Sequence, residues 1–184
     1  MEDLRNLFKK TIEKELVPFL AKFNFEYKYG IHEFSETHDT FMFKKHESYL
    51  EIYHMGFNPK DAPWSFIILL GKKGFKKTTS QFDSIPLWYL KQKIAPPYDY
   101  QREAIKLTFN EYDINNDLQI RQSIENAIFE LSNFCNDFLT GDFVRFDRIR
   151  QINYLEYLVQ TQVISESNWF GLQKIVMKSN EEIE

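Results

Sequence analysis

Apolar side chains at the start of the chain recur every three or four residues, which is the spacing of one face of an α-helix. The pattern covers residues 2–22. Pro18 interrupts it, so we expect a kink there, or a helix that restarts with Pro18 in its first turn. Asn24 follows the last turn and tolerates the left-handed conformation that ends helices. The stripe comprises Leu4, Leu7, Phe8, Thr11, Ile12, Leu16, Leu20 and Phe23.

From Phe25 to Leu70 the apolar period changes to that of β-strands. Turn-forming sequences separate four segments, and their short connections predict an antiparallel meander. The fourth segment contains WSFIILL, which is almost wholly apolar, so we expect it in the centre of the sheet and covered on both sides. The predicted strands are residues 31–36, 39–45, 49–57 and 64–70.

The second half of the chain returns to helical spacing. Residues 84–94 fit a short helix with Pro86 in its first turn, whereas 104–112 alternate and predict a fifth strand. A long helix is expected from Asp117, as its N-cap, to Gly141. Its buried stripe would be Ile120, Ile124, Ile128, Leu131, Cys135 and Phe138, and two further helices are predicted over 143–160 and 167–178.

These patterns predict one α+β domain over residues 1–184. An N-terminal helix (1–22) precedes a mostly antiparallel sheet of four to five strands with a short helix (25–112), and three C-terminal helices (117–178) pack on the sheet. Hydrophobic residues make up 43% of the chain and charged residues 27%, which is typical of a globular protein.

Charge and cysteine content narrow the possible settings. The formal net charge of −4 argues against a nucleic-acid partner. Cys135 is the single cysteine, so an internal disulfide is impossible and a reducing compartment is expected. The charged N-terminus does not resemble a signal peptide, and no apolar run reaches 18 residues, so we expect a cytoplasmic protein that does not span a membrane.

Histidines are concentrated in the predicted sheet and invite a metal-site hypothesis. His38 and His46 flank the same predicted strand, which separates them by about 26 Å at the usual rise per residue. Pairing the hairpins places His54 opposite Thr40, and Phe43 opposite both His32 and Glu51. At most His38 and His54 lie close together, and a metal needs more ligands than two. We therefore expect ordinary turn and strand histidines, and we predict no metal.

Other segments resemble known chemical motifs but lack the residues that the geometry of each motif requires. The basic segment LLGKKGFKK lacks the spacing of a P-loop. DINND, residues 113–117, resembles the start of a calcium loop, but Leu118 stands where glycine is needed and Ile124 where glutamate is needed. Cys135 lies on an apolar helical stripe, which favours a core residue over a nucleophile. No catalytic residue and no cofactor are predicted.

One stretch resembles a known group of proteins. ELVPFLAKFNFEYKYG (15–30), a polar hairpin and the strand SFIILLG (65–71) resemble small bacterial domains found among immunity proteins of polymorphic toxin systems. The shared features are Leu16, Pro18 and Leu20 at the end of the helix, then Asn24-Phe25 where the group has Gly-Phe. The resemblance covers about the first 70 residues. It implies toxin neutralisation and identifies no functional residue.

Our leading hypothesis is a non-enzymatic domain that binds another protein, such as a toxin, through rigid aromatic side chains. The predicted contact residues are Trp88, Tyr98, Asp99 and Tyr100 in and near the proline-rich segment APPYDY, with packing of that segment on the domain as the alternative. The rival hypothesis is a small-molecule-binding protein or an enzyme whose pocket is lined by His32, Glu33, Glu51 and His54. RNA binding through Lys72, Lys73, Lys76 and Lys77 is a third possibility. The oligomeric state stays open.

Overall fold

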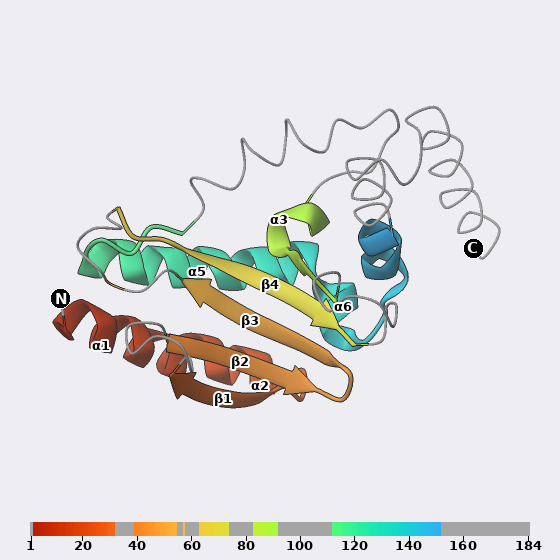
Figure 1. Cartoon of the computed structure of the whole chain (residues 1–184), viewed down its shortest axis with the longest axis horizontal. Helices are drawn as coiled ribbons and strands as arrows, with labels where there is room; N and C mark the ends of the chain where they lie inside the picture. Colours follow the sequence, from red (N-terminus) through yellow and green to blue (C-terminus); the bar gives the residue numbers. More distant parts are fainter. Residues whose placement is uncertain are drawn as a thin grey trace.

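The fold combines a five-stranded antiparallel sheet with helices, as the α+β prediction requires (Figure 1). The computed structural model describes residues 2–31, 39–54, 57, 63–73, 83–91 and 112–151. The strand order is β1-β2-β3-β4-β5, so every strand pairs with its neighbour in sequence and the predicted meander is confirmed. The strands are β1 (Glu26–Ile31), β2 (Asp39–Lys45), β3 (Ser48–His54), β4 (Phe66–Lys72) and β5 (Ser84–Pro86).

The N-terminal helix is continuous but changes its winding near Pro18. It runs through α1 (Glu2–Thr11), the π-helical segment η1 (Ile12–Leu16) and α2 (Val17–Ala21), with Pro18 in the first turn of α2. Proline has no N–H to donate and its ring crowds the carbonyl four residues earlier. The wider π turn lies directly before the proline, where this conflict arises. Asn24 then takes φ 65° after the helix, as predicted.

The hairpin between β2 and β3 fixes the register of the sheet. Its loop has two residues, because Lys45 pairs with Ser48, and His46 takes φ 51° within it. The predicted β2–β3 register was wrong by one position, because Phe43 faces Leu50 rather than Glu51. The predicted β1–β2 register was wrong by five positions, because Phe43 faces Tyr27 rather than His32. A shift of one residue exchanges the two faces of a strand. The prediction had assumed a three-residue loop.

The first and last strands differ from their predicted positions. β1 begins directly after the helix end and covers residues 26–31, whereas the prediction began at residue 31; residues 32–36 lie outside the described residues. Residues 84–86 were expected to begin a helix but form β5 against β4. Pro86 is the N-cap of the short helix α3 (Leu87–Leu90). Proline has no N–H group to donate, and a strand at the edge of a sheet tolerates it because the outer side of that strand need not form hydrogen bonds.

The segment before the second long helix also pairs with β4. Asp113 forms a bridge with Ser65, the Phe66 amide donates to the Tyr112 carbonyl (3.1 Å), and the Ile114 amide donates to the Trp64 carbonyl (3.0 Å). The fifth strand predicted at 104–112 otherwise lies outside the described part of the chain.

The long C-terminal helix is interrupted at Cys135. α5 (Asp117–Phe134) and α6 (Asn136–Thr140) replace the single predicted helix, and Gly141 ends α6 in the left-handed conformation at φ 104°. The N-cap is Asn116, whose side chain accepts from the Gln119 amide, so the predicted cap at Asp117 was wrong by one residue. Residues 144–151 are again helical.

The core lies between the sheet and the layer formed by α1, η1, α2 and α5, which pack behind the strands in Figure 1. Most residues of the two predicted stripes are buried, and Ala127, outside the predicted stripe, is buried as well. The partly buried members are Leu4, Leu7, Thr11, Phe23 and Ile128. No helix in the described ranges is long and apolar enough to cross a bilayer. The centre of the core contains Phe8, Ile12, Leu16, Phe41, Phe43, Leu50, Ile52, Phe66, Ile68, Leu70, Ile120, Ile124 and Leu131.

Candidate functional site

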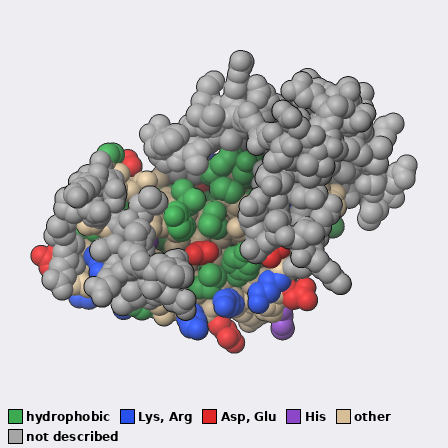
Figure 2. Space-filling model, viewed as in Figure 1, with side chains coloured by type: hydrophobic (Ala, Val, Ile, Leu, Met, Phe, Trp, Pro, Cys, Tyr) green, Lys and Arg blue, Asp and Glu red, His purple; other side chains and the backbone are tan. Residues whose placement is uncertain are grey.

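The most prominent surface among the described residues is the face of the sheet opposite α1, α2 and α5, which we call the outer face. Alternate residues of β2, β3 and β4 are buried against the helices, and the residues between them keep part of their surface exposed. Tyr53 is 44% exposed. Figure 2 shows hydrophobic side chains gathered over the centre of the sheet. The outer face consists of Met42, Tyr49, Tyr53, Ile67 and Leu69, with Glu51 among them.

Cross-strand pairing brings these apolar side chains together. Met42 pairs with Glu51, Glu51 with Leu69, and Tyr53 with Ile67. Directly opposite residues project from the same face with their Cβ atoms about 5 Å apart. The outer face is therefore one contiguous patch across three strands.

Tyr49 has a second role at the end of this patch. It pairs with Gly71, and a Cβ atom on that glycine would lie 2.1 Å from Cζ of the Tyr49 ring. The absence of a side chain at Gly71 thus lets the ring lie flat on β4. Burial raises the pKa of the Tyr49 hydroxyl.

A polar cluster lies on the other face, between α1 and the ends of β1 and β2. Arg5 donates to Asp39 from Nε (2.8 Å to Oδ2) and from Nη2 (2.7 Å to Oδ1). The Tyr29 hydroxyl donates to the same carboxylate over 2.6 Å, and Nζ of Lys9 lies 3.6 Å from the Tyr29 ring centroid. The Asp39 side chain is 1% exposed. The chain thus holds a buried carboxylate with three donated hydrogen bonds.

The surroundings shift the protonation equilibria of this cluster. Burial favours the neutral acid, but the hydrogen bonds from Arg5 and Tyr29, with the charges of Arg5 and His54, outweigh it and lower the pKa of Asp39. Burial, followed by the hydrogen bond to the carboxylate, raises the pKa of Tyr29 to about 12. Asp39 is therefore an ionised acceptor at neutral pH, and its lone pairs are engaged by residues of the fold.

His54 belongs to the core near this cluster. Its ring lies 5.5 Å from the Phe8 ring, 5.9 Å from Phe41 and 5.9 Å from Phe57, measured between centroids. His46 lies in the β2–β3 turn, and His32 and His38 lie outside the described residues. The described residues include no group of three or more potential metal ligands. His54 lies in strand β3 and His46 in the β2–β3 turn, the positions that the sequence predicted.

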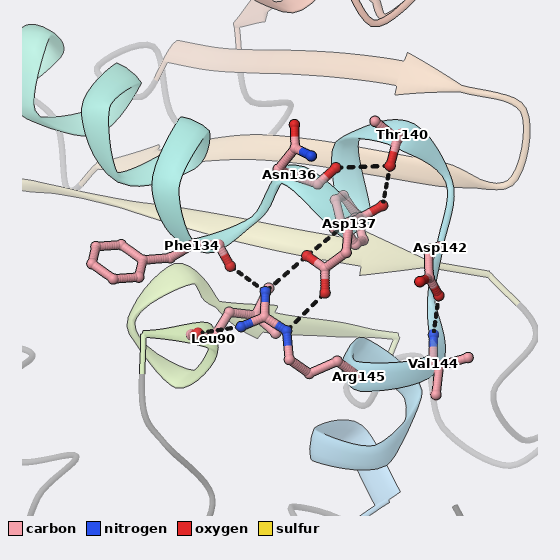
Figure 3. Close-up of polar contacts among 9 residues, drawn as sticks. Leu90, Phe134, Asn136, Asp137, Thr140, Asp142, Val144 and Arg145 are labelled. Carbon is pink, nitrogen blue, oxygen red and sulfur yellow. Dashed lines mark hydrogen bonds and ion pairs between the residues drawn. The ribbon is translucent and has the colours of Figure 1, made fainter. Parts of the chain in front are cut away.

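A second ion pair ties three helix ends together (Figure 3). Arg145 donates to Asp137 from Nε (2.7 Å to Oδ2) and from Nη2 (2.7 Å to Oδ1). The same guanidinium donates to the carbonyl of Leu90 at the end of α3 (2.9 Å) and to that of Phe134 at the end of α5. Helix ends expose carbonyls without intrahelical partners, and Arg145 satisfies two of them. All the contacts of Arg145 named here are with residues of the fold, which indicates a structural role for this ion pair.

A third cluster joins the end of β4 to residues 144–151. Lys72 Nζ lies 2.9 Å from Asp147 Oδ2, and Arg150 Nη2 lies 2.7 Å from Asp147 Oδ1. Arg150 also donates to the Lys72 carbonyl over 2.6 Å. Burial is the main cause that lowers the pKa of Arg150. Lys72, one of the lysines proposed for RNA, is thus engaged within the domain; Lys76 and Lys77 lie outside the described residues.

The contact residues predicted from the sequence fall in two regions. Trp88 is 5% exposed, and its ring stacks on Tyr89 with centroids 4.0 Å apart. For Trp88, the structure therefore agrees with the alternative, in which the residue packs within the domain. Tyr98, Asp99 and Tyr100 lie outside the described residues, so their contact role stays a prediction.

The rival hypothesis predicted a pocket between the sheet and the helices, and the two predicted lining residues that the structure describes do not lie on the same face of the sheet. Glu51 lies on the outer face and His54 on the helix-covered face of β3, because residues three apart on a strand point to opposite sides. The other two members, His32 and Glu33, lie outside the described residues. The prediction that Glu51 and His54 line one pocket was wrong, and the reason is strand parity.

Two of the rejected chemistries have a structural explanation. Cys135 is fully buried, and burial raises the pKa of its thiol, which disfavours the nucleophilic thiolate. In the DINND turn, Asn115 Oδ1 accepts from the Trp64 amide (2.6 Å) and Asn115 Nδ2 donates to the Trp64 carbonyl (3.2 Å). Asn115 therefore anchors the turn to the strand region, and the expected turn before a helix is confirmed.

The sequence analysis missed both the outer face and the Asp39 cluster. The excess of apolar residues in FIILLG was a signal that β4 is apolar on both faces, but it was attributed to coverage on both sides. Arg5 and Asp39 are 34 residues apart, and no local pattern links them. Comparison of the chain with protein-family models, curated proteins and solved structures finds no match.

Proposed function

We propose that this chain is a non-enzymatic protein-binding domain whose contact surface is the outer face. The observation that carries the proposal is the group of partly exposed apolar residues Met42, Tyr53, Ile67 and Leu69, which surround Glu51 on the sheet face opposite the helical layer. Exposed apolar patches of this kind mark interaction sites in soluble domains. Tyrosine in the patch adds a rigid ring of the type enriched at interface hot spots.

The border of the patch supports the same function. Glu26, Lys28 and Lys44 are exposed on β1 and β2, on the same side of the sheet as the patch. Figure 2 shows charged side chains of both signs along the lower edge of the hydrophobic area. Apolar side chains bordered by charged residues are common in protein interfaces, and here one carboxylate, Glu51, also lies between Met42 and Leu69. The partner that fits is a protein with an apolar surface and charged residues at one side of it.

Substitutions on the outer face test the proposal. Tyr53→Glu and Ile67→Glu introduce a carboxylate into the patch, and Phe129→Glu provides the matched control, because Phe129 is 63% exposed on α5. Wild type and variants serve as baits in lysate of the source organism, with quantitative mass spectrometry as the first readout. The protein that distinguishes them is then purified and titrated by calorimetry.

We expect a protein captured by wild type and by Phe129→Glu, and lost with Tyr53→Glu and Ile67→Glu. In the titration, each outer-face variant should raise the dissociation constant about tenfold or more, because a buried carboxylate without a partner is costly. Circular dichroism verifies that the variants are folded. If every captured protein binds wild type and outer-face variants equally, the outer face is not the contact surface.

A bacterial toxin is the partner class that the resemblance of the first 70 residues supports. Co-expression with a toxin encoded beside this chain tests it directly. Growth should recover with wild type and with Phe129→Glu, and fail to recover with Tyr53→Glu. Equal rescue by all three proteins would separate toxin neutralisation from the outer face, and no rescue by wild type would reject that toxin as the partner.

A further inference from the structure

The outer edge of β1 presents backbone groups that the sheet does not use. β1 is the terminal strand, and within the described residues no backbone hydrogen bond reaches it from the side opposite β2. In Figure 1, β1 lies at the lower border of the sheet. Unpaired edges are templates for pairing with another strand, and proteins usually guard them with charges.

The charges on β1 have opposite signs. Glu26 and Lys28 are both exposed on the outer side of the strand, where they alternate with Tyr27 and Tyr29 on the helix side. A guard of one sign repels a second copy of the same edge. A Glu–x–Lys pattern does not, because an antiparallel copy centred on the middle residue places each glutamate opposite a lysine.

We propose that two copies of this chain pair antiparallel through residues 26–28 at the start of β1, centred on Tyr27, so that their sheets join. In this register Glu26 of each copy faces Lys28 of the other, which gives two opposite-charge pairs related by the two-fold axis. Within each chain Glu26 also faces Lys44 on β2. Each glutamate therefore lies between two lysines, one from its own sheet and one from the second copy.

Charge also selects this register over its neighbour. Centring the pair on Lys28 would set the two copies of that lysine directly opposite, which is unfavourable. The pairing engages Glu26 and Lys28 of the charged border but leaves the apolar residues of the outer face free, so the Tyr53→Glu and Ile67→Glu variants, which lie away from β1, distinguish the two proposals.

A charge-reversal cycle tests the pairing. The proteins are wild type, Glu26→Lys, Lys28→Glu and the double variant Glu26→Lys/Lys28→Glu, analysed by sedimentation equilibrium over a range of concentrations. Lys73→Glu is the matched control, because Lys73 is exposed beyond the end of β4 and its substitution makes the same change in charge as Lys28→Glu. Amide hydrogen exchange of β1 at low and high protein concentration is the second readout.

We expect a wild-type dimer, an increase in its dissociation constant on the order of tenfold for each single variant, and recovery in the double variant. Lys73→Glu should match wild type, and β1 amides should become protected as the dimer forms. A wild-type monomer at all concentrations would overturn the proposal. So would a dimer that the single reversals leave unchanged, or one that the double reversal fails to restore.

Discussion

The two faces of one sheet have different roles in this molecule. On the helix-covered face, β2, β3 and β4 contribute side chains that are almost fully buried, such as Phe41, Leu50 and Ile68. On the outer face the same strands carry Met42, Tyr53 and Ile67, which keep part of their surface exposed. Both sets are apolar, so composition does not separate them. What separates them is which face the amphipathic helices cover.

This difference indicates which apolar residues the fold requires. The helix-covered face gains stability from close packing, whereas exposed apolar residues on the outer face contribute little to it. Apolar side chains that the described fold does not bury need another explanation, and partner binding supplies one. Substitutions on the two faces should therefore differ in what they damage, and the following predictions are ordered by the expected effect.

The largest loss of stability is expected for Phe41→Ala. The Phe41 ring contacts Phe8 (5.5 Å), Tyr29 (5.5 Å) and His54 (5.9 Å), measured between ring centroids. Its removal leaves a cavity and should lower the free energy of unfolding by about 3–5 kcal/mol. Tyr53→Ala on the outer face should change it by less than about 1 kcal/mol. Urea unfolding measures both, and equal losses would contradict the division between the faces.

Asp39→Asn should lower the free energy of unfolding by about 2–3 kcal/mol at neutral pH, because the charged hydrogen bonds from Arg5 and Tyr29 are weakened. The folded state has the lower pKa, so this contribution is present above the unfolded-state pKa of about 4 and is lost as the pH falls through the folded-state pKa.

Urea unfolding at pH 7 and at pH 3 measures this pH dependence. Wild type should lose stability as the pH is lowered, and Asp39→Asn should lose less of it. Asp3→Asn, an exposed aspartate on α1, is the control and should behave like wild type. An unchanged pH dependence in Asp39→Asn would show that the cluster contributes no linked stability.

Gly71→Ala should be the exception on the outer face. A Cβ atom there would overlap the Tyr49 ring, which must rotate outward, and we expect a loss of about 1–2 kcal/mol. Gly30→Ala is the matched control, since a Cβ atom on Gly30 meets nothing within 4 Å, and its effect should be within about 0.5 kcal/mol of zero. Thermal unfolding of both variants compares them, and a neutral Gly71→Ala would mean that the ring does not rest on β4.

The smallest expected effect is a gain. His46 takes a positive φ in the two-residue turn, a conformation that costs little only for glycine, so His46→Gly should raise the free energy of unfolding by about 0.5–1 kcal/mol. Asn24→Gly, also at positive φ, should gain less because asparagine tolerates this conformation. Chemical denaturation measures both changes. A loss in His46→Gly would indicate that the His46 side chain itself supports the turn.

Local patterns predicted most of the elements but not their exact register. The helical stripe from Phe8 to Leu20 and the bounds of β2 follow from periodicity, because each residue's face depends only on its spacing. The register between β2 and β3 depended on one backbone conformation at His46, which the sequence does not reveal. The separation of Glu51 and His54 does not depend on that register, because residues three apart on one strand point to opposite sides of the sheet.

The candidate site was less predictable than the fold. Trp88 was expected at a contact surface, yet its ring is buried at the start of a short helix. The outer face was not identified, although its residues lie within predicted strands. A strand pattern shows that two sets of side chains alternate, but it does not show which set the helices cover when both are apolar.

The sequence by itself determined the α+β class, the meander and the apolar stripes of the helices, because these depend on spacing and on turn-forming residues close in the chain. Only the tertiary structure decided the β2–β3 register, the pairing of Asp39 with Arg5 and the apolar face that stays outside. Each of these depends on how segments distant in the sequence pack together. In a sheet, a register shift of one residue moves the side chains of a strand from the buried face to the exposed face.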